Sequence, residues 1–477
     1  MRKHFLMAMM MLFVAVSSAL AQQAKYVFYF IGDGMGVNQV NGTEAYRAEL
    51  EGRIGITPLL FASFPYGAMV TTYSGTNGVT DSAASGTALA TGHKTKNGTL
   101  GLAVDRQTPI QSVAAKAQAN GKRVGVATSV SVDHATPAAF YAHVPDRGMY
   151  YEIGKDLVKT GFDFYAGSDF LNPSSRKAPE EGTLYEQCQK AGYTIARGYK
   201  DYGKKRAKAD KMILFQTEEA SKKDRTSIPY AIDRKKGDMT LAEITRAGIN
   251  FLSKGDDNGF FLMVEGGKID WACHANDAAT AFNEVIDFDN AIRVAYEFYE
   301  QHPDETLIVV TADHETGGIV LGKGRYELNL QALRYQRVSV NGLSAKFNEL
   351  RKNTGNKVTW EMAKKTLSEN FGLFGDVKVN EQQEARLRRV FDDTFVGKKP
   401  ALDASEYQKD EHIATVAKEI LDDIAMVGWV SGGHSDGYVP VFAIGAGAEK
   451  FHGRIDNTEI PKNIIESAGW KRSEERR

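Results

Sequence analysis

The segment Tyr26-Val-Phe-Tyr-Phe-Ile31, followed by Gly32-Asp33-Gly34-Met35-Gly36, is the clearest indication of the fold. The run is apolar or aromatic throughout, which is typical of a parallel strand buried on both faces. The glycines let the chain turn sharply and leave the short Asp33 carboxylate at the carboxyl end of the strand. Asp33 is interpreted as an ion ligand, with a turn aspartate as the alternative. A dinucleotide fingerprint is excluded because position 37 is valine.

Five more apolar runs predict further buried parallel strands: Arg123–Ser129, Met212–Gln216, Phe260–Val264, Leu307–Thr311 and Val439–Ile444. Helical patterns lie between them, at Ser82–Ala90, Ile110–Ala119, Thr240–Leu252, Ala275–Tyr299 and Ile413–Met426. This alternation predicts an α/β fold with a doubly wound, largely parallel central sheet flanked by helices. Residues 22–477 are interpreted as one domain, with a mostly helical insertion or cap at about 323–410.

Composition excludes several classes of protein. The 477 residues include 59 Lys plus Arg and 60 Asp plus Glu, a net charge of −1, so no nucleic-acid partner is expected. Two cysteines cannot form a disulfide framework. No stretch beyond the N-terminal region is long and apolar enough to predict a transmembrane segment.

Residues 1–21 have the pattern of a signal peptide. Arg2 and Lys3 precede the apolar run Phe5–Val16, and Ala19-Leu20-Ala21 is an A-x-A cleavage pattern. The mature chain is therefore expected to be periplasmic or secreted, with an uncleaved N-terminal anchor as the alternative.

Side chains that bind metals follow three of the predicted strands. Asp33 follows the first, Glu265 follows Phe260–Val264, and Asp313-His314 follows Leu307–Thr311. The carboxyl ends of parallel strands meet at one sheet edge, so these groups are expected to converge.

A second group of metal-binding side chains lies before and after Asp313-His314 in the sequence. Asp270 and His274 are four residues apart, which places them on one helical face, although such a pair is also common on protein surfaces. His434 lies in the glycine loop Ser431-Gly432-Gly433-His434-Ser435. Such nitrogen and oxygen ligands suit zinc, with a neighbouring oxygen-rich site for magnesium.

Ser82 is the candidate nucleophile. It begins a helix of small residues, Asp81-Ser82-Ala83-Ala84-Ser85, where Thr80 or Asp81 can act as the N-cap. The helix N-terminus stabilises a phosphoryl oxygen there. The alternative is that Ser82 is itself only a cap.

Taken together, these motifs resemble alkaline phosphatase over nearly the whole mature chain. The resemblance rests on Asp81–Ser85, Thr91-Gly92-His93-Lys94-Thr95, Val264-Glu265-Gly266 with Ile269-Asp270 and His274, and Thr311-Ala312-Asp313-His314. It implies two zinc sites and one magnesium site, with Ser82 as the nucleophile and Arg147 as the phosphate clamp. The implied ligands are Asp270, His274 and His434 for one zinc, Asp33, Asp313 and His314 for the second, and Asp33, Thr136 and Glu265 for magnesium.

Two residues depart from the enterobacterial pattern of that family. His134 stands where that branch has an aspartate, and Trp271 stands where it has a lysine near the phosphate. Both are expected to line the substrate site, His134 with an effect on the third metal and Trp271 with an effect on phosphate release and pH dependence. Cys273, beside His274, is interpreted as a buried thiol rather than a ligand.

The resemblance implies hydrolysis of phosphate monoesters with broad specificity through a phosphoserine intermediate on Ser82. Members of the family are commonly dimers, so a homodimer is a candidate assembly. A phosphodiesterase of the same superfamily and a non-catalytic metal- or phosphate-binding protein are the alternatives. A sulfatase is excluded because Ser82-Ala83-Ala84-Ser85-Gly86 lacks the C/S-x-P-x-R motif.

Overall fold

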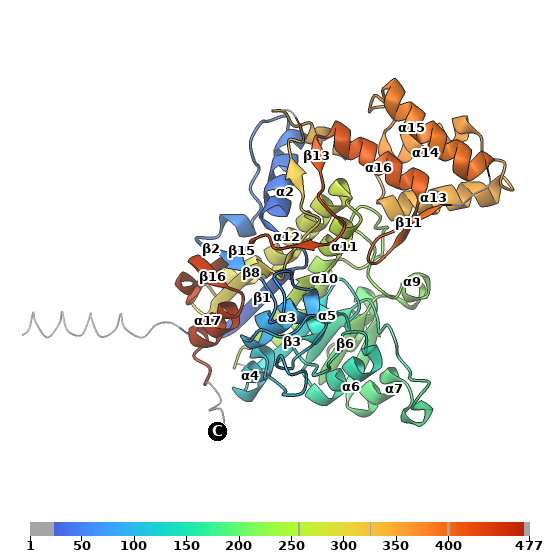
Figure 1. Cartoon of the computed structure of the whole chain (residues 1–477). Helices are drawn as coiled ribbons and strands as arrows, with labels where there is room; N and C mark the ends of the chain where they lie inside the picture. The colour runs from blue at the N-terminus through green and yellow to red at the C-terminus, as the bar shows by residue number, and fades with distance from the viewer. Residues whose placement is uncertain (1–22, 256–257, 325, 398–400, 472–477) are drawn as a thin grey trace, which may run out of the picture.

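The central feature is a ten-stranded sheet with the order β16-β2-β15-β8-β1-β7-β3-β4-β6-β5 (Figure 1). The computed structural model describes residues 23–255, 258–324, 326–397 and 401–471, and the predicted signal peptide lies outside them. The strands of the sheet are β1 (Tyr26–Gly32), β2 (Tyr66–Thr71), β3 (Arg123–Thr128), β4 (Phe164–Gly167), β5 (Tyr193–Arg197), β6 (Lys211–Phe215), β7 (Phe260–Gly266), β8 (Thr306–Ala312), β15 (Val439–Gly445) and β16 (Gly453–Asp456).

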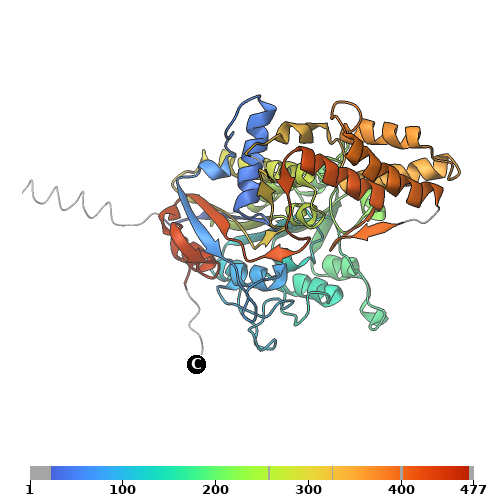
Figure 2. The same cartoon turned by 45° about the horizontal axis from the view of Figure 1, so that its top comes forward.

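Helices cover both faces of this sheet (Figures 1 and 2). One face is covered by α10 (Leu241–Leu252) and α12 (Ala278–Tyr299), with α2 (Val37–Leu50) and α11 (Lys268–His274) packed on α12. The other is covered by α4 (Val113–Ala119) and α5 (Ala135–Ala138), with α3 (Ser82–Thr91) and α17 (Glu459–Ser467) beside them. Shorter helices follow the outer strands: α6 (Tyr150–Thr160), α7 (Leu184–Lys190), α8 (Tyr199–Lys205) and α9 (Glu218–Lys223). The predicted α/β class is confirmed.

One predicted strand direction is wrong. The run at 439–444 forms β15, which pairs antiparallel with both β8 and β2, whereas the other neighbouring strands of the sheet are parallel. An apolar run shows only that both faces of a strand are covered, and it carries no information on direction. The predicted helix Ala275–Tyr299 also begins later, at Ala278, because Asn276 has a φ of 53° and separates α11 from α12.

The helical segment after residue 323 projects away from the sheet (Figure 1). It contains α13 (Val340–Asn353), α14 (Trp360–Phe371) and α15 (Glu381–Phe391), and a hairpin of β11 (Leu402–Ala404) and β12 (Lys409–Glu411) leads into α16 (His412–Ile424). Leu343, Leu367, Leu387 and Ile420 belong to a second buried apolar cluster, which reaches the main body at Phe282 of α12. The segment therefore has apolar packing of its own and is also fixed to the sheet domain.

Two short antiparallel pairs complete the fold near the carboxyl end of β8. They are β9 (Glu315–Thr316) with β14 (His434–Ser435), and β10 (Val320–Leu321) with β13 (Val427–Gly428). Among the described residues, no helix combines the length and hydropathy needed to cross a membrane.

The turn after β1 requires glycine at position 34. Gly34 has a φ of +71°, and its N–H donates to Asp313 Oδ1 at 3.1 Å. A methyl group there would lie 2.8 Å from Asp270 Cα and 2.9 Å from Thr316 Oγ1. This turn thus brings Asp33, Asp270 and Asp313 together, and only glycine leaves the space for it.

We predict that Gly34→Ala lowers the free energy of unfolding by more than the strain of the left-handed backbone alone, which is about 1–2 kcal/mol. Gly52→Ala is the matched control, because Gly52 has a φ of +73° but nothing lies within 4 Å of its added methyl group. Denaturant unfolding measures both variants. Equal losses of stability would contradict the steric role of Gly34.

Candidate functional site

The predicted site begins where three adjacent strands end together. β1 lies between β8 and β7, with Gly32 in register with Ala312 on one side and Gly266 on the other. Asp33 and Asp313 are therefore the first residues beyond neighbouring strands, and Glu265 is the last but one residue of β7. The prediction that these strand ends converge is confirmed.

His314 lies at the centre of the first group of side chains. Its Nε2 is 3.3 Å from Asp33 Oδ1, 3.3 Å from Asp313 Oδ2 and 3.1 Å from Ser82 Oγ. Its Nδ1 lies 3.1 Å from Thr316 Oγ1, whose hydroxyl donates to Asp270 Oδ1 at 2.6 Å. Thr316 Oγ1 must then accept the proton of His314 Nδ1, so the lone pair of Nε2 faces two carboxylates and the serine. That arrangement suits a bound cation.

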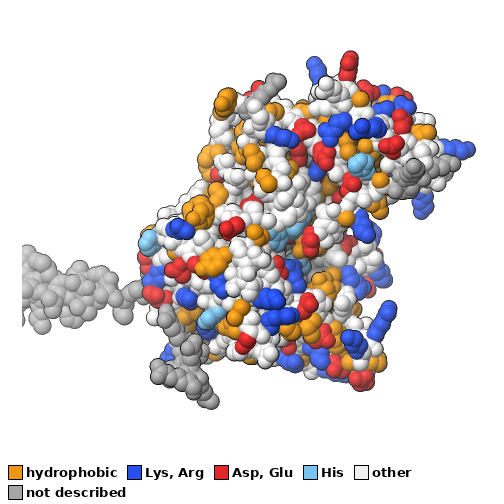
Figure 3. Space-filling view, in the orientation of Figure 1, with side chains coloured by type: hydrophobic (Ala, Val, Ile, Leu, Met, Phe, Trp, Pro, Cys, Tyr) orange, Lys and Arg blue, Asp and Glu red, His pale blue; other side chains and the backbone are white. Residues whose placement is uncertain are grey.

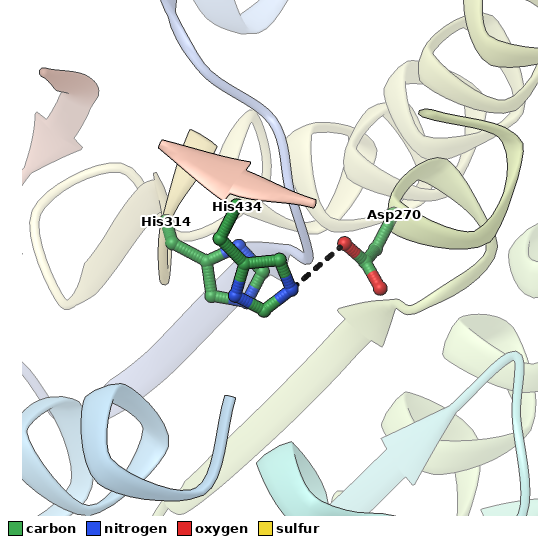
Figure 4. A group of neighbouring side chains, drawn as sticks. All are labelled: Asp270, His314 and His434. Atoms are coloured by element: carbon green, nitrogen blue, oxygen red, sulfur yellow. Dashed lines mark ion pairs between the residues drawn. The ribbon is translucent and has the colours of Figure 1, made fainter. Parts of the chain in front are cut away.

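Asp270 and His434 form a second group with His314, which also belongs to the first (Figure 4), and His274 adjoins this second group. The Nε2 atoms of His274 and His434 are 3.1 Å apart, and Asp270 lies 3.3 Å from the former and 3.7 Å from the latter. The Nδ1 atoms donate to backbone carbonyls, from His274 to Gly432 at 2.6 Å and from His434 to Thr80 at 2.8 Å. When neutral, both rings therefore direct lone pairs to one point, as metal-binding histidines do.

A third group surrounds Glu265. Ligand atoms of Asp33, His134 and Glu265 lie within 4.8 Å of one another. Thr136 Oγ1 lies 3.4 Å from Asp33 Oδ2, and Thr128 donates a hydrogen bond to Glu265. The structure thus brings together the residues predicted for the magnesium site, and it adds the His134 ring, with Nδ1 3.9 Å from Glu265 Oε1.

The donor atoms of these groups fit bound cations. Asp33, Glu265, Asp270 and Asp313 are all fully buried, and each has one carboxylate oxygen without a hydrogen-bond partner. A buried anionic oxygen without a partner is costly, and a cation offsets that cost.

Burial and mutual repulsion shift the pKa values of this cluster. Burial, and next the Asp313 carboxylate, raises the pKa of Asp33 well above its ordinary value. Burial, and next Asp270, raises the pKa of Asp313 to about 8, and burial raises that of Glu265 to about 7. Burial also lowers the pKa of His134 to about 3, so its ring is neutral and able to bind a metal.

Ser82 is the first residue of α3 and is fully buried. The N-cap is Asp81, which accepts a hydrogen bond from Ala84 N at 2.9 Å through Oδ1. Ser82 is therefore not the cap, and its hydroxyl points toward His314 instead. The position combines the positive end of α3 with the metal-binding group.

Arg147 reaches this point from a turn between Val144 and α6. Its Nη1 donates to Asp81 Oδ2 at 3.1 Å, and its Nη2 lies 3.4 Å from His134 Nε2. Asp81 thus caps α3 with one oxygen and holds the guanidinium with the other. This places the bidentate donor group of Arg147 near Ser82.

Trp271 lies beside the site, and its partner there was not predicted from the sequence. The ring of Trp271 stacks on Tyr407 with centroids 4.5 Å apart, and Tyr407 also packs edge-on against His274 at 5.4 Å. Tyr407 does not belong to a recognisable sequence motif, and its place at the site is apparent only from the folded structure. Cys273 is buried, as predicted, and faces Gln39 rather than the histidines.

The site opens between the two parts of the molecule. Figure 3 shows histidine side chains in a hollow between the projecting helices and the sheet domain, with basic side chains nearby. A substrate can therefore reach the strand ends from this face.

Comparisons with known proteins agree with this arrangement. The family model described as alkaline phosphatase matches residues 24–163 and 180–469. Alkaline phosphatase 3 of Bacillus subtilis (strain 168) is 32% identical over 463 residues, which cover 93% of this chain and 89% of the relative.

Solved structures give the same result. The cold-active alkaline phosphatase of Shewanella sp. has a TM-score of 0.74 at 29% identity, covering 93% of this chain and 99% of that one. The Thermus thermophilus alkaline phosphatase has a TM-score of 0.75 at 27% identity, covering 95% and 94%. A histidine-to-glutamate variant of the enzyme from the Antarctic bacterium TAB5, with Mg bound in its M3 site, has a TM-score of 0.65 at 26% identity, covering 95% and 100%. The chain belongs to the alkaline phosphatase family of enzymes, which hydrolyse phosphate monoesters with the help of metal ions.

Proposed function

We propose that this enzyme transfers the phosphoryl group of a monoester to Ser82 and then to water, with two zinc ions and one magnesium ion bound. The observation that carries the proposal is the position of Ser82 Oγ, 3.1 Å from His314 Nε2 beside Asp33 and Asp313. A serine used only for structure has no need of three metal-binding side chains around its hydroxyl.

The types of donor atom support the choice of metals. Asp270, His274 and His434 offer two imidazoles and a carboxylate, and Asp33, Asp313 and His314 offer one imidazole and two carboxylates, as zinc prefers. Asp33, Thr136 and Glu265 offer oxygen atoms, as magnesium prefers. Bound there, the cations would lower the pKa of the attacking hydroxyl group and of water, and would stabilise charge on the leaving oxygen.

The chain's own residues would hold the phosphoryl group for the reaction. Arg147 would donate two parallel hydrogen bonds to phosphoryl oxygens, while Asp81 fixes the guanidinium. Backbone N–H groups at the start of α3 would stabilise the charge that develops as Ser82 attacks. All these groups face the phosphate rather than the alcohol, which supports broad specificity for monoesters.

Export and assembly belong to the same proposal. The basic start, the apolar run and the Ala19–Ala21 pattern support cleavage near Ala21 and a periplasmic or secreted enzyme. A homodimer stays a prediction, as does the interpretation of residues 323–410 as a cap on a single domain.

We predict that Ser82→Ala lowers kcat/KM for p-nitrophenyl phosphate by about three orders of magnitude or more, with unchanged metal content. Ser112→Ala is the matched control, because Ser112 caps α4 and its hydroxyl bonds only backbone groups, the Ala115 N–H and the Phe140 carbonyl. It should lose about 1 kcal/mol of stability and keep its turnover.

The same assay should include bis(p-nitrophenyl) phosphate. Full activity of Ser82→Ala would refute the assignment of Ser82 as the nucleophile. If the unmodified enzyme hydrolysed the diester faster than the monoester, the phosphodiesterase alternative would be favoured.

We predict that the metal-free protein loses thermal stability between about pH 6.5 and pH 8, above the range in which the lowered pKa values of His134 and His314 act in the opposite sense. Asp313 and Glu265 have raised pKa values of about 8 and 7, so the folded state holds their protons more tightly than the unfolded state does. Their contribution is therefore complete in acid and is lost as the pH rises through these values.

Added zinc and magnesium should raise the melting temperature most at the alkaline end, because cations offset the ionised carboxylates. Scanning calorimetry with and without a chelator checks this prediction. A metal-free melting temperature that rises over this range would contradict it.

We predict that His134→Asp strengthens magnesium binding at the third group, because it replaces an imidazole with a hard oxygen ligand beside Asp33 and Glu265. The variant of the TAB5 enzyme that holds magnesium at M3 also has a carboxylate in place of a histidine. His452→Asp, on an exposed loop, is the control for the change in charge. Magnesium titration of activity and metal analysis measure the effect, and equal magnesium requirements in both variants would contradict it.

A further inference from the structure

We propose that Tyr407 is a positioning residue for Arg147, and that the helical segment at 323–410 serves the active site by holding this one side chain in place. The inference rests on the proposed function, in which Arg147 binds the phosphoryl group. It is supported by the contact between the Tyr407 hydroxyl and the Arg147 guanidinium, in which Oη lies 3.5 Å from Nη2.

Arg147 depends on side-chain contacts for its orientation. It lies in a turn flanked by the exposed residues Asp146 and Gly148, and a long arginine side chain loses considerable rotamer freedom when it is fixed. Asp81 holds only Nη1. On the Nη2 side the guanidinium meets His134 and Tyr407, so Tyr407 completes the support at the side away from α3.

The ring of Tyr407 is itself fixed by the site. It stacks on Trp271 with an interplanar angle of 13°, and it packs edge-on against His134 and His274, with centroids at 5.8 Å and 5.4 Å. Tyr407 thus joins two metal-binding rings to the aromatic residue that follows Asp270. Contacts on several sides leave its hydroxyl in a defined place beside Arg147.

The hairpin that carries Tyr407 is anchored at its base. Gln408 donates to Asp410 at 2.8 Å, and Asp410 accepts hydrogen bonds from Ser344 and Asn341 of α13, each at 3.2 Å. Tyr230 of the main body donates to Gln408 at 3.3 Å. The helical segment thereby reaches the phosphate-binding groups through Tyr407.

Tyr407→Phe tests the inference, because it removes the hydroxyl and keeps the stacked ring. We expect the inhibition constant of inorganic phosphate and the KM for p-nitrophenyl phosphate to rise by about two- to tenfold, with kcat changed less. Tyr407→Ala should have a larger effect on both constants. Tyr66→Phe, an exposed residue at the start of β2, is the matched control and should change neither.

A double-mutant cycle with Arg147→Ala separates positioning from a general structural role. In that background Tyr407→Phe should add no further loss of phosphate binding. Unchanged phosphate inhibition in Tyr407→Phe, or an equal loss with and without Arg147, would overturn the inference. If Arg147→Ala itself leaves hydrolysis unchanged, the role of Arg147 in the proposed function fails instead. Melting temperature and metal content confirm that each variant is folded and loaded.

Discussion

The structure depends on the cost of gathering buried negative charge at one edge of a sheet. Asp33, Glu265, Asp270 and Asp313 are all removed from water, and burial and mutual repulsion raise the pKa values of three of them. Asp270 is the exception: although burial opposes it, the neighbouring histidines lower its pKa. Isolated carboxylates in such surroundings would cost several kcal/mol each. Part of that cost is offset by the glycine turn, whose N–H donates to Asp313. The histidines held by carbonyl groups and the proposed cations offset it further.

Short motifs explain why much of the site was predictable. Asp33, Glu265 and Asp313 each lie within two residues of the end of an apolar run, and His314 follows Asp313 directly. The strand and its ligand are therefore recognisable in the same stretch of sequence. Once the three strands are parallel neighbours, their ends must meet. Arg147 has no such local signal and is assigned only by resemblance to the family, whereas His434 is indicated by its glycine loop before the last predicted strand.

Other features depend on contacts that a linear pattern does not encode. The direction of β15 is set by its neighbours β2 and β8, not by its apolar residues. The strands β2, β4, β5 and β16 were not predicted: β4 and β16 have only four residues each, and β2 and β16 lie toward one edge of the sheet with exposed or partly exposed residues. Tyr407 is brought to the site by a hairpin whose anchors, Asp410 and Gln408, look like ordinary polar residues in the sequence. Thr316, two residues after His314, fixes the orientation of that ring and was missed although it lies within the same motif.

The hydrogen bond from His434 to the carbonyl of Thr80 has a consequence for how the enzyme is assembled. Thr80 lies two residues before Ser82, so the loop that leads into α3 is tied to the His434 ring. A cation held by that ring, as proposed above, would also help to fix this loop. Loading of the metal site and alignment of the proposed nucleophile would then be coupled steps.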